Sequence, residues 1–326
     1  MPALSVVIPT HNSQDTIGPL LESILSQDFN DIEVLIIDDA SSDATESIVK
    51  RFNVRYMRLD SRSGPSAARN YGVSRARSQC IVFFDSDVVL REGVLRRFHE
   101  KLSDRAIRAV IGLYDKIPLN DGLVPWYKAI QEQVWFDDIV GDTVTTFTPS
   151  VGAIRKDLFD RLGGFDSVYT GAEVEDYEFS HKLLKEDRIY LDRTIRVRHR
   201  FPSFEKLVKS YARRCFLWAQ LFLKDPRFDN NATTSRQALA VMFYAASVLL
   251  LLLGPIMASC SWAGLTPLTV ALFLDRRFVS YAFKEKGLLF AVYTAGMNLF
   301  LSLIILVSGG AGIIYGLTKQ HKESRR

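Results

Sequence analysis

The sequence predicts an α/β fold in which a mostly parallel sheet is flanked by helices and followed by transmembrane helices. Short apolar segments alternate with amphipathic ones along the first 200 residues, and this alternation indicates right-handed strand–helix–strand crossovers and therefore a parallel sheet. Several of the apolar segments end directly in polar clusters. Two long apolar blocks fill most of the chain after residue 237, and such blocks are typical of membrane-spanning helices.

Four strands are predicted in the first 90 residues. Leu4–Pro9 and Ile32–Ile37 read as short buried strands, and Val54–Leu59 as a weaker third one. The fourth, Cys80–Phe84, is apolar throughout, as expected for a strand covered by helices on both faces.

Helices are predicted between these strands. Asp15 is placed to cap the first helix, whose apolar stripe consists of Ile17, Leu20, Leu21, Ile24 and Leu25. Asp43 and Glu46 have the spacing of a capping box at the start of the second helix. The third helix is expected to open at Gly64-Pro65-Ser66 and to run to Arg77.

After Leu102 the pattern is less regular. We expect strands at Ala109–Tyr114 and Thr148–Ile154, and a helix that begins at Lys156. Between the strands, residues 118–142 form a helical or loop insertion whose aromatic side chains favour packing over substrate binding.

Three polar clusters follow strands of the predicted parallel sheet: His11-Asn12, Asp38-Asp39 and Asp85-Ser86-Asp87. The carboxyl ends of parallel strands meet at one sheet edge, where ligands bind in open α/β folds. Asp85 and Asp87 suit a hard divalent cation that bridges the protein to substrate phosphates, although this tripeptide alone is also compatible with an ordinary turn. The chain has no G-x-G-x-x-G after the first strand, no P-loop motif and no nucleophile elbow.

A further acidic segment begins a predicted helix after Gly171, with Glu173, Glu175, Asp176 and Glu178 in its first turns. Acidic residues are common at helix N-termini because they interact favourably with the helix dipole. The alternative is a carboxylate held at the helix tip as a general base.

The chain resembles the inverting family-2 glycosyltransferases, which have the GT-A fold. The resemblance covers roughly residues 4–200 and rests on an ordered series of motifs: Val6-Val7-Ile8-Pro9-Thr10-His11-Asn12, Ile36-Ile37-Asp38-Asp39-Ala40-Ser41-Ser42-Asp43, Gly64-Pro65-Ser66-Ala67-Ala68-Arg69-Asn70, Phe84-Asp85-Ser86-Asp87, Gly163-Gly164-Phe165-Asp166 and Glu175-Asp176. It implies a GT-A-type sheet and transfer of a sugar from a nucleotide donor.

The resemblance also implies roles for residues around the nucleotide. Asp39 would bond the nucleobase imide, with His11 and Arg69 close to the base. Pro9 and Asp38 would belong to the same nucleotide site. His11 stands where the family often has an aromatic residue, commonly tyrosine.

The remaining implied roles concern the metal and the chemistry. Asp87 would hold Mn²⁺ or Mg²⁺ on the diphosphate. The other metal ligands would be Asp85, which would also help to orient the sugar, and His199 near the diphosphate. Asp176, supported by Glu175, would act as the general base that removes the acceptor proton, so that one displacement inverts the anomeric configuration.

The C-terminal third is predicted to bind a membrane. From Arg193 to Arg236 there are eleven Lys or Arg residues against three Asp or Glu residues, which is typical of the cytoplasmic flank of a membrane segment. Phe201–Asp225 has the pattern of an amphipathic helix, either on an anionic membrane surface or packed on the sheet. Nucleic acid is not expected as a partner.

The number of membrane spans is open between two and four. Ala238–Cys260 is long enough to span, Leu288–Leu317 fits a tilted span, and Trp262–Leu274 is short. Three spans would place the basic tail outside, against the positive-inside rule, and four would need helix breaks near Gly254-Pro255 and Gly309-Gly310. We expect the cationic segment 276–286 to form a cytoplasmic loop.

The expected organisation is a catalytic domain at 1–200, an interface helix and linker at 201–236, a transmembrane region at 237–317 and a basic tail at 318–326. The three widely spaced cysteines and the strand at residues 4–9, with no leader before it, indicate a catalytic domain in a reducing compartment on the cytoplasmic face. The predicted protein is a membrane-anchored inverting glycosyltransferase that uses a nucleotide-sugar, with a UDP-sugar favoured, and a lipid or lipid-linked acceptor. The alternatives are a polyprenyl-phosphate hexosyl synthase and a catalytically silent sugar-nucleotide-binding scaffold.

Overall fold

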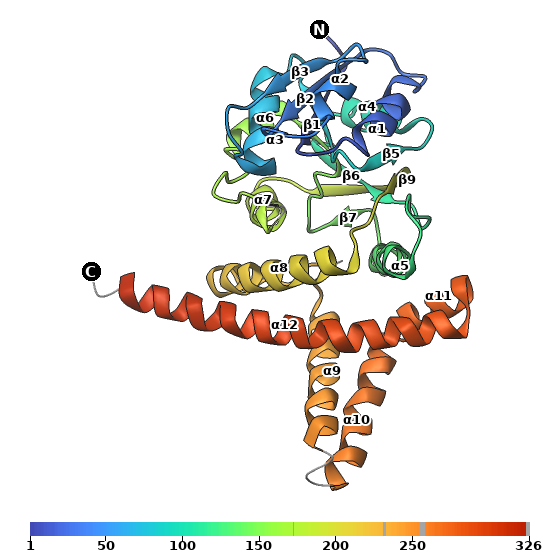
Figure 1. Cartoon of the computed structure of the whole chain (residues 1–326). Coiled ribbons are helices and arrows are strands. Elements are labelled where there is room, and N and C mark those ends of the chain that lie inside the picture. The colour runs from blue at the N-terminus through green and yellow to red at the C-terminus, as the bar shows by residue number, and fades with distance from the viewer. Residues whose placement is uncertain (172, 231–232, 254–257, 324–326) are drawn as a thin grey trace. The chain divides into compact units, whose positions relative to one another are not determined.

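The computed structural model describes residues 1–171, 173–230, 233–253 and 258–323 and contains two compact units (Figure 1). Unit 1 comprises residues 1–120 and 139–200 and holds the sheet. Unit 2 comprises residues 121–138 and 201–326, and the elements described in it are helices. The chain passes from unit 1 to unit 2 after residue 200, and residues 121–138 also belong to unit 2.

The first half of the sheet in unit 1 is parallel, as predicted. Its strands lie in the order β3 (Arg55–Arg58), β2 (Ile32–Asp38), β1 (Leu4–Thr10) and β4 (Cys80–Phe84). The central strand β1 pairs with β2 along its whole length, and Thr10 lies opposite Asp38. Since β4 flanks β1 on the other side, the ends of these three strands lie next to one another.

The second half of the sheet is largely antiparallel, which the sequence pattern did not indicate. It continues through β8 (Val151–Arg155), β6 (Ala109–Tyr114), β9 (Ile189–His199) and β5 (Val88–Leu90), and β7 (Thr143–Val144) pairs with β9. The strand β9 was missed because charged residues interrupt its apolar positions throughout. It carries His199 to a position opposite Val88, directly beside Asp87.

Helices cover both faces of the sheet: α1 (Ile17–Leu25), α2 (Thr45–Val49), α3 (Gly64–Arg75), α4 (Val94–Ser103), α6 (Lys156–Arg161) and α7 (Glu175–Leu183).

Two predicted helix N-caps are wrong. The N-cap of α1 is Thr16 rather than Asp15, and α2 begins after Ala44 without a capping box, because Glu46 pairs with Lys50. Leu25 was expected in the buried stripe of α1 but is 43% exposed.

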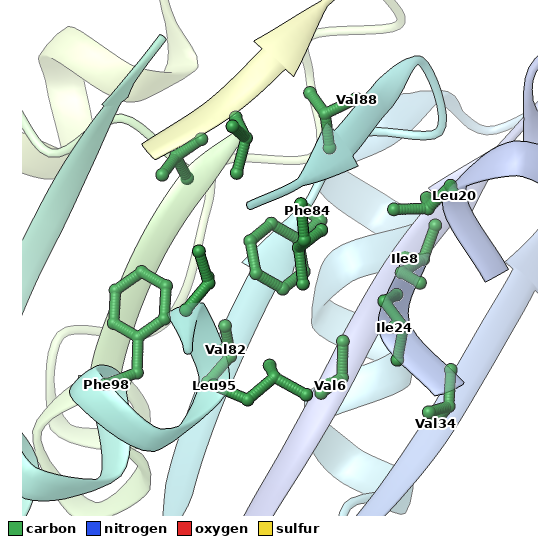
Figure 2. Close-up of a cluster of buried hydrophobic side chains, with 14 of the residues drawn as sticks. Val6, Ile8, Leu20, Ile24, Val34, Val82, Phe84, Val88, Leu95 and Phe98 are labelled. Carbon is green, nitrogen blue, oxygen red and sulfur yellow. The ribbon is translucent and has the colours of Figure 1, made fainter. Parts of the chain in front are cut away.

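The core follows from the alternation of side chains along β1 and β4. Val6 and Val82 point to one face, where α1 and α4 contribute Leu20, Ile24, Leu95 and Phe98 (Figure 2). Val7 and Phe83 point to the other face. There α3 approaches so closely that a Cβ on Gly72 would lie 2.4 Å from Val7 Cγ1. Phe83 contacts an aromatic group formed by Phe147, Phe159 and Phe165.

Unit 2 contains α5 (Leu123–Asp137), α8 (Phe204–Lys224), α9 (Ser235–Leu253), α10 (Ala258–Leu274), α11 (Arg276–Lys286) and α12 (Leu288–Glu323). The helices α9 and α10 pack as a hairpin, and α8 packs along α12. A smaller core joins α5, α8, α11 and α12 through Tyr127, Ile130, Leu207, Phe278 and Met297.

Within the described residues, two helical segments are long and apolar enough to cross a membrane, Ser235–Leu253 and Leu288–Lys319. The helix α9 covers the expected span Ala238–Cys260 as far as Leu253, where the described residues are interrupted. The suggested break at Gly254-Pro255 lies outside the described residues. At Gly309-Gly310 the helix α12 continues without a break, and the expected loop 276–286 is the helix α11.

Candidate active site

The three polar clusters identified in the sequence lie at one edge of unit 1, where β1, β2 and β4 end. The turns that follow β1 and β2 are joined by hydrogen bonds. The backbone N–H of Asp39 donates to Thr10 O at 2.8 Å, and the N–H of Asn12 donates to Ser41 Oγ at 2.9 Å. Asn12 and Ala40 have positive φ angles of 49° and 56°, which non-glycine residues adopt at a cost and which surrounding contacts must hold. This edge is therefore fixed before any ligand binds.

The ring of His11 is oriented by the second cluster. Its Nδ1 lies 2.8 Å from the carbonyl oxygen of Asp39. Because a carbonyl only accepts hydrogen bonds, Nδ1 carries the proton, and Nε2 of a neutral ring is an acceptor. Its ring is thereby held in one orientation beside Asp39, at the place expected for a nucleobase.

Asp39 and Asp38 are both buried, and both carboxylates accept hydrogen bonds within the protein. Asp39 accepts the backbone N–H groups of Ser63 and Gly64 at 2.6 and 2.9 Å, so its carboxylate lies at the N-terminus of α3. Asp38 accepts from the N–H of Ser41 at 2.8 Å and from the hydroxyl of Tyr56. Burial and the nearby Asp38 raise the pKa of Tyr56, so this phenol remains a donor. A nucleobase would use the lone pairs of Asp39 that remain.

Arg69 connects two parts of the site. Its side chain is 4% exposed, Nη2 donates to Asp85 Oδ1 at 2.7 Å, and Nη1 lies 3.5 Å from Glu175 Oε1. The guanidinium also lies over the ring of Phe165, 5.6 Å from its centroid. Burial opposes the charge on Arg69, but the carboxylates of Asp85 and Glu175 outweigh it and hold the pKa above its ordinary value.

Asp87 lies on the other side of this edge, with His199. Its Oδ1 is 3.4 Å from His199 Nε2, and its backbone carbonyl accepts the N–H of Arg200 at 3.0 Å. The His199 ring is stacked on Tyr114, with centroids 4.4 Å apart and an interplanar angle of 10°. The hydroxyl of Tyr114 in turn donates to Ser150 Oγ at 2.7 Å.

The donor set fits a divalent cation only in part. In the described part of the chain, no group of three or more His, Cys, Asp or Glu side chains is arranged to hold a metal. Asp85, one of the three predicted metal ligands, is bonded to Arg69 instead. Asp87 Oδ1, however, is a buried carboxylate oxygen without a hydrogen-bond donor, and carboxylate oxygens suit Mn²⁺ or Mg²⁺.

The acidic segment after Gly171 places its first helical residues next to Arg69. Glu175 begins α7, is buried, and accepts the backbone N–H of Glu173 at 2.7 Å. Asp176 is half-buried, and its Oδ1 accepts the N–H of Tyr177 at 2.9 Å. The electrostatic influence of Asp176 on Arg69 places this carboxylate within the same charged group.

The predicted site residues thus form three local groups: His11 with Asp38, Asp39 and the end of β1 at Pro9; Arg69 with Asp85, Glu175 and Asp176; and Asp87 with His199. Two contributors were missed, Tyr114 under the His199 ring and Ser13, whose Oγ lies 2.8 Å from Ser86 Oγ. A tyrosine at the end of a predicted strand was the available signal for the first of them.

Residues 5–163 match the family model described as Glycosyl transferase family 2. Curated relatives include the glycosyltransferase GlyG of Streptococcus pneumoniae serotype 4, 27% identical over 176 residues, which are 49% of this chain and 58% of the relative. A second is the GalNAc(5)-diNAcBac-PP-undecaprenol beta-1,3-glucosyltransferase of Campylobacter jejuni, 34% identical over 110 residues, 32% of this chain and 36% of the relative. The chain thus matches between about a third and three fifths of the length of these relatives.

Two solved structures share the fold over nearly the whole chain. One is the mannosyltransferase PcManGT from Pyrobaculum calidifontis in complex with GDP-Man and Mn²⁺, with a TM-score of 0.54 and 19% identity, covering 98% of this chain and 86% of that one. The other is TarS 1–349 of S. aureus in complex with UDP-GlcNAc, with a TM-score of 0.52 and 19% identity, covering 95% and 92%. The predicted GT-A-type α/β fold with C-terminal helices is confirmed.

Proposed function

Since residues 5–163 carry a glycosyl transferase family 2 domain and unit 1 has the GT-A fold, we propose that this protein is a membrane-anchored inverting glycosyltransferase. Its donor is a nucleotide-sugar, with a UDP-sugar favoured, and its acceptor is a lipid or a lipid-linked saccharide. The catalytic unit faces the cytoplasm. The observation that carries this proposal is the placement of Arg69 between Asp85 and Glu175 at the edge where β1, β2 and β4 end.

The nucleotide is assigned to the turns after β1 and β2. The His11 ring would lie against the base, and the remaining lone pairs of Asp39 would accept the imide N–H of a uracil. TarS binds UDP-GlcNAc and PcManGT binds GDP-Man, so both kinds of nucleotide occur among proteins of this fold. The imide N–H of a uracil is a donor that this carboxylate accepts, and the N1–H of a guanine is another, so the preference for UDP over GDP is tested directly by the donor panel below.

The diphosphate is assigned to the region of Asp87. Asp87 Oδ1 and His199 would hold a divalent cation there, with Asp85 Oδ2 as a further oxygen. A bound Mn²⁺ or Mg²⁺ would neutralise the charge that develops on the leaving nucleoside diphosphate. The hydrogen bond from Arg69 holds Asp85 in place, so that this carboxylate keeps its position as the donor enters.

The acceptor is assigned to the side of α7. Asp176 would remove the proton from the acceptor hydroxyl as the oxygen attacks the anomeric carbon opposite the leaving group. One displacement inverts the anomeric configuration and needs no covalent sugar intermediate. Glu175, bonded to the N–H of Glu173 and near Arg69, fixes the first turn of α7 that carries Asp176.

The lipid acceptor is inferred from the apolar helices of unit 2. A relative with a polyprenyl-linked substrate in its name, the Campylobacter jejuni enzyme, supports an acceptor of this class. In a release assay, a native membrane lipid extract should therefore support turnover, and a soluble saccharide should not.

The test is nucleotide release by the detergent-solubilised full chain, with UDP-, GDP- and TDP-sugars, lipid extract, and Mn²⁺ or Mg²⁺ present or omitted. We expect metal-dependent UDP release from one donor, lost in Asp87→Ala and retained in the control Asp28→Ala, whose surface carboxylate pairs with Arg96. Nucleotide binding without turnover of any donor would indicate the scaffold function instead. Failure to bind any nucleotide would overturn the proposal.

A further inference from the structure

We propose that the chain crosses the membrane only through the α9–α10 hairpin, and that the long apolar helix α12 lies with α8 in the plane of the membrane surface. This topology goes beyond the proposed function, which is compatible with two to four spans. The inference concerns unit 2 alone and rests on three observations. These are the packing of α12 on α8, the charges that α8 carries, and the contacts at the base of the hairpin.

The helices α8 and α12 run parallel, and the central part of α12 is in contact with α8 over most of the length of α8. Phe204 near the start of α8 lies against Phe300, with ring centroids 5.6 Å apart. Further towards the C-terminus of both helices, Phe216 of α8 lies against Tyr315 of α12, with ring centroids 5.7 Å apart. Because the contacts advance in the same direction on both helices, the two helices must share one orientation in the membrane.

Two glycines on one side of α12 make this contact close. A Cβ on Gly312 would lie 2.3 Å from the carbonyl oxygen of Phe216, and one on Gly316 would lie 2.8 Å from Leu223 Cδ1. Small residues four positions apart let two helix backbones approach in this way. Gly309 and Gly310, by contrast, face open space. The pairing of α8 with α12 is therefore built into the sequence.

The charges of α8 determine where the pair can lie. The helix has 21 residues, about 31 Å at 1.5 Å per residue, with Arg213 and Arg214 near its middle and Lys206 and Lys209 in its first half. If α12 crossed the bilayer, α8 would cross beside it and carry both arginines to the depth of the hydrocarbon core. Charged side chains there are costly and rare. An amphipathic helix with basic residues on its polar face instead suits the interface.

The apolar side of α12 that α8 does not cover is exposed. Leu289 is 88% exposed, Val307 71% and Ile314 67%, at positions spread along the whole helix. Its apolar segment Leu288–Lys319 of 32 residues is about 48 Å long, well beyond the ~30 Å of a hydrocarbon core. An acyl-chain surface that lies parallel to the helix would cover this side from end to end.

The hairpin has the dimensions of a membrane insert. The helices α9 and α10 have 19 and 17 residues, about 28 and 26 Å, and Ser247 Oγ donates to Gly264 O at 2.8 Å inside the hairpin. In Figure 1 the two helices lie side by side and run across the direction of α8 and α12.

Both ends of the hairpin meet at one residue. Arg236 at the start of α9 and Arg277 after α10 bind the two carboxylate oxygens of Asp138. The two ends therefore lie on the same side of the membrane. Two crossings keep the arginines at both hairpin ends on the same side as the basic C-terminal segment, as the positive-inside rule requires, whereas a third crossing through α12 would separate them.

The first test locates the C-terminus and the hairpin turn in bacterial cells. A reporter that is active only in the cytoplasm is fused after Arg326 of the full chain, and a second reporter, active only outside, is inserted between Leu253 and Ala258. We expect both to be active. An outside location of the C-terminus would overturn the proposal, because it would require α12 to cross.

The second test separates an interfacial α12 from a helix that enters and leaves the bilayer. Single nitroxide labels are placed through Val292→Cys, Val307→Cys, Ile314→Cys and, in the hairpin, Met242→Cys, in full chains with Cys80, Cys215 and Cys260 replaced by alanine. In anionic vesicles, depth is measured from the ratio of oxygen to nickel-complex collision rates. We expect a deep label at 242 and equal, shallow depths at the three α12 positions. A depth maximum at Val307 would overturn the proposal.

Discussion

Arg69 Nη2 donates to Asp85 Oδ1 at 2.7 Å, while the other terminal nitrogen of Arg69 lies 3.5 Å from Glu175 Oε1. One buried cation thus joins the end of β4 to the start of α7. The segments proposed to bind the nucleotide-sugar and the acceptor are ninety residues apart in the chain, and this contact fixes them relative to each other. Removal of the Arg69 guanidinium should therefore affect the stability of unit 1 as well as activity.

The first prediction concerns Arg69→Met. This change leaves Glu175 buried without its counter-charge and Asp85 without its donor, and breaking a buried ion pair from one side costs about 3–5 kcal/mol. Because Asp85 is one third exposed, we expect the lower end of this range. The readout is urea-dependent labelling of Cys80 in β4 in a chain with Cys215→Ala and Cys260→Ala, because Cys80 then reports on unit 1 alone.

The matched control is Arg96→Met. Arg96 pairs with Asp28 at 2.9 Å, but the side chains are 47% and 64% exposed, and such surface pairs contribute about 0–1 kcal/mol. A loss of stability in Arg69→Met no larger than in this control would show that the buried contact does not hold unit 1 together.

The location of the site could be predicted from the sequence because β1, β2 and β4 are apolar and end abruptly in polar residues. Parallel pairing then required the three clusters to share an edge. The partners of Asp85 and Asp87 could not be predicted in the same way. Arg69 is in the middle of a helix, and His199 ends a strand whose charged residues hid its alternation. Both contacts depend on tertiary packing, which a local pattern does not encode.

The second prediction separates the two interpretations of the acidic start of α7. If Asp176 is the general base, Asp176→Asn should lower the rate of nucleotide release by about 10²–10⁴-fold and leave nucleotide binding intact. The control is Glu178→Gln in the same turn of α7. Glu178 pairs with Lys182 at 3.4 Å and accepts from the Tyr169 hydroxyl, so its loss should change the rate little. Full activity of Asp176→Asn would favour an acceptor phosphate, which needs little base catalysis, as in a polyprenyl-phosphate hexosyl synthase.

The third prediction concerns the pH dependence of unit 1. Glu33 in β2 accepts hydrogen bonds from Ser5 Oγ at 2.6 Å, from the backbone N–H of Arg77 at 2.5 Å and from Arg55 at 2.5 Å. Burial opposes the charge, but these donors outweigh it and lower the pKa of Glu33 below 4.5. The ionised form is therefore stabilised by folding, and this contribution is present above pH 4.5 and lost as the pH falls through the folded-state pKa.

Glu33→Gln should accordingly reduce the stability of unit 1 at pH 7 by about 1–3 kcal/mol, as expected for lost hydrogen bonds to a charged group. The difference from the unchanged chain should shrink as the pH falls from 5 to 3. The measurement is Cys80 labelling against urea at each pH, with a disulfide reagent that reacts at acid pH. A difference that stays constant over this range would mean that the charge of Glu33 contributes nothing.

In unit 2, too, the local sequence pattern predicts the elements but not their packing. Hydropathy identified the apolar segments around α9, α10 and α12, but it could not tell which helix packs on which. The role of Gly312 and Gly316 depends on α8, about a hundred residues earlier in the chain. The spacing of the two glycines can be read from the sequence, but the helix that packs against them is known only from the structure.

The last prediction tests this packing with two glycines of one helix. Gly312→Ala would place a methyl group 2.3 Å from Phe216 O, so α12 must move away from α8, at a cost of about 1–3 kcal/mol. Gly310→Ala meets nothing within 4 Å and should instead stabilise the helix by up to about 1 kcal/mol, because alanine has the higher helix propensity. All four tryptophans of the chain belong to unit 2, so their fluorescence during urea unfolding in detergent reports on this unit. If α12 is in close contact with α8, the two substitutions should change the stability of unit 2 in opposite directions. Equal changes in stability would mean that the two helices are separate.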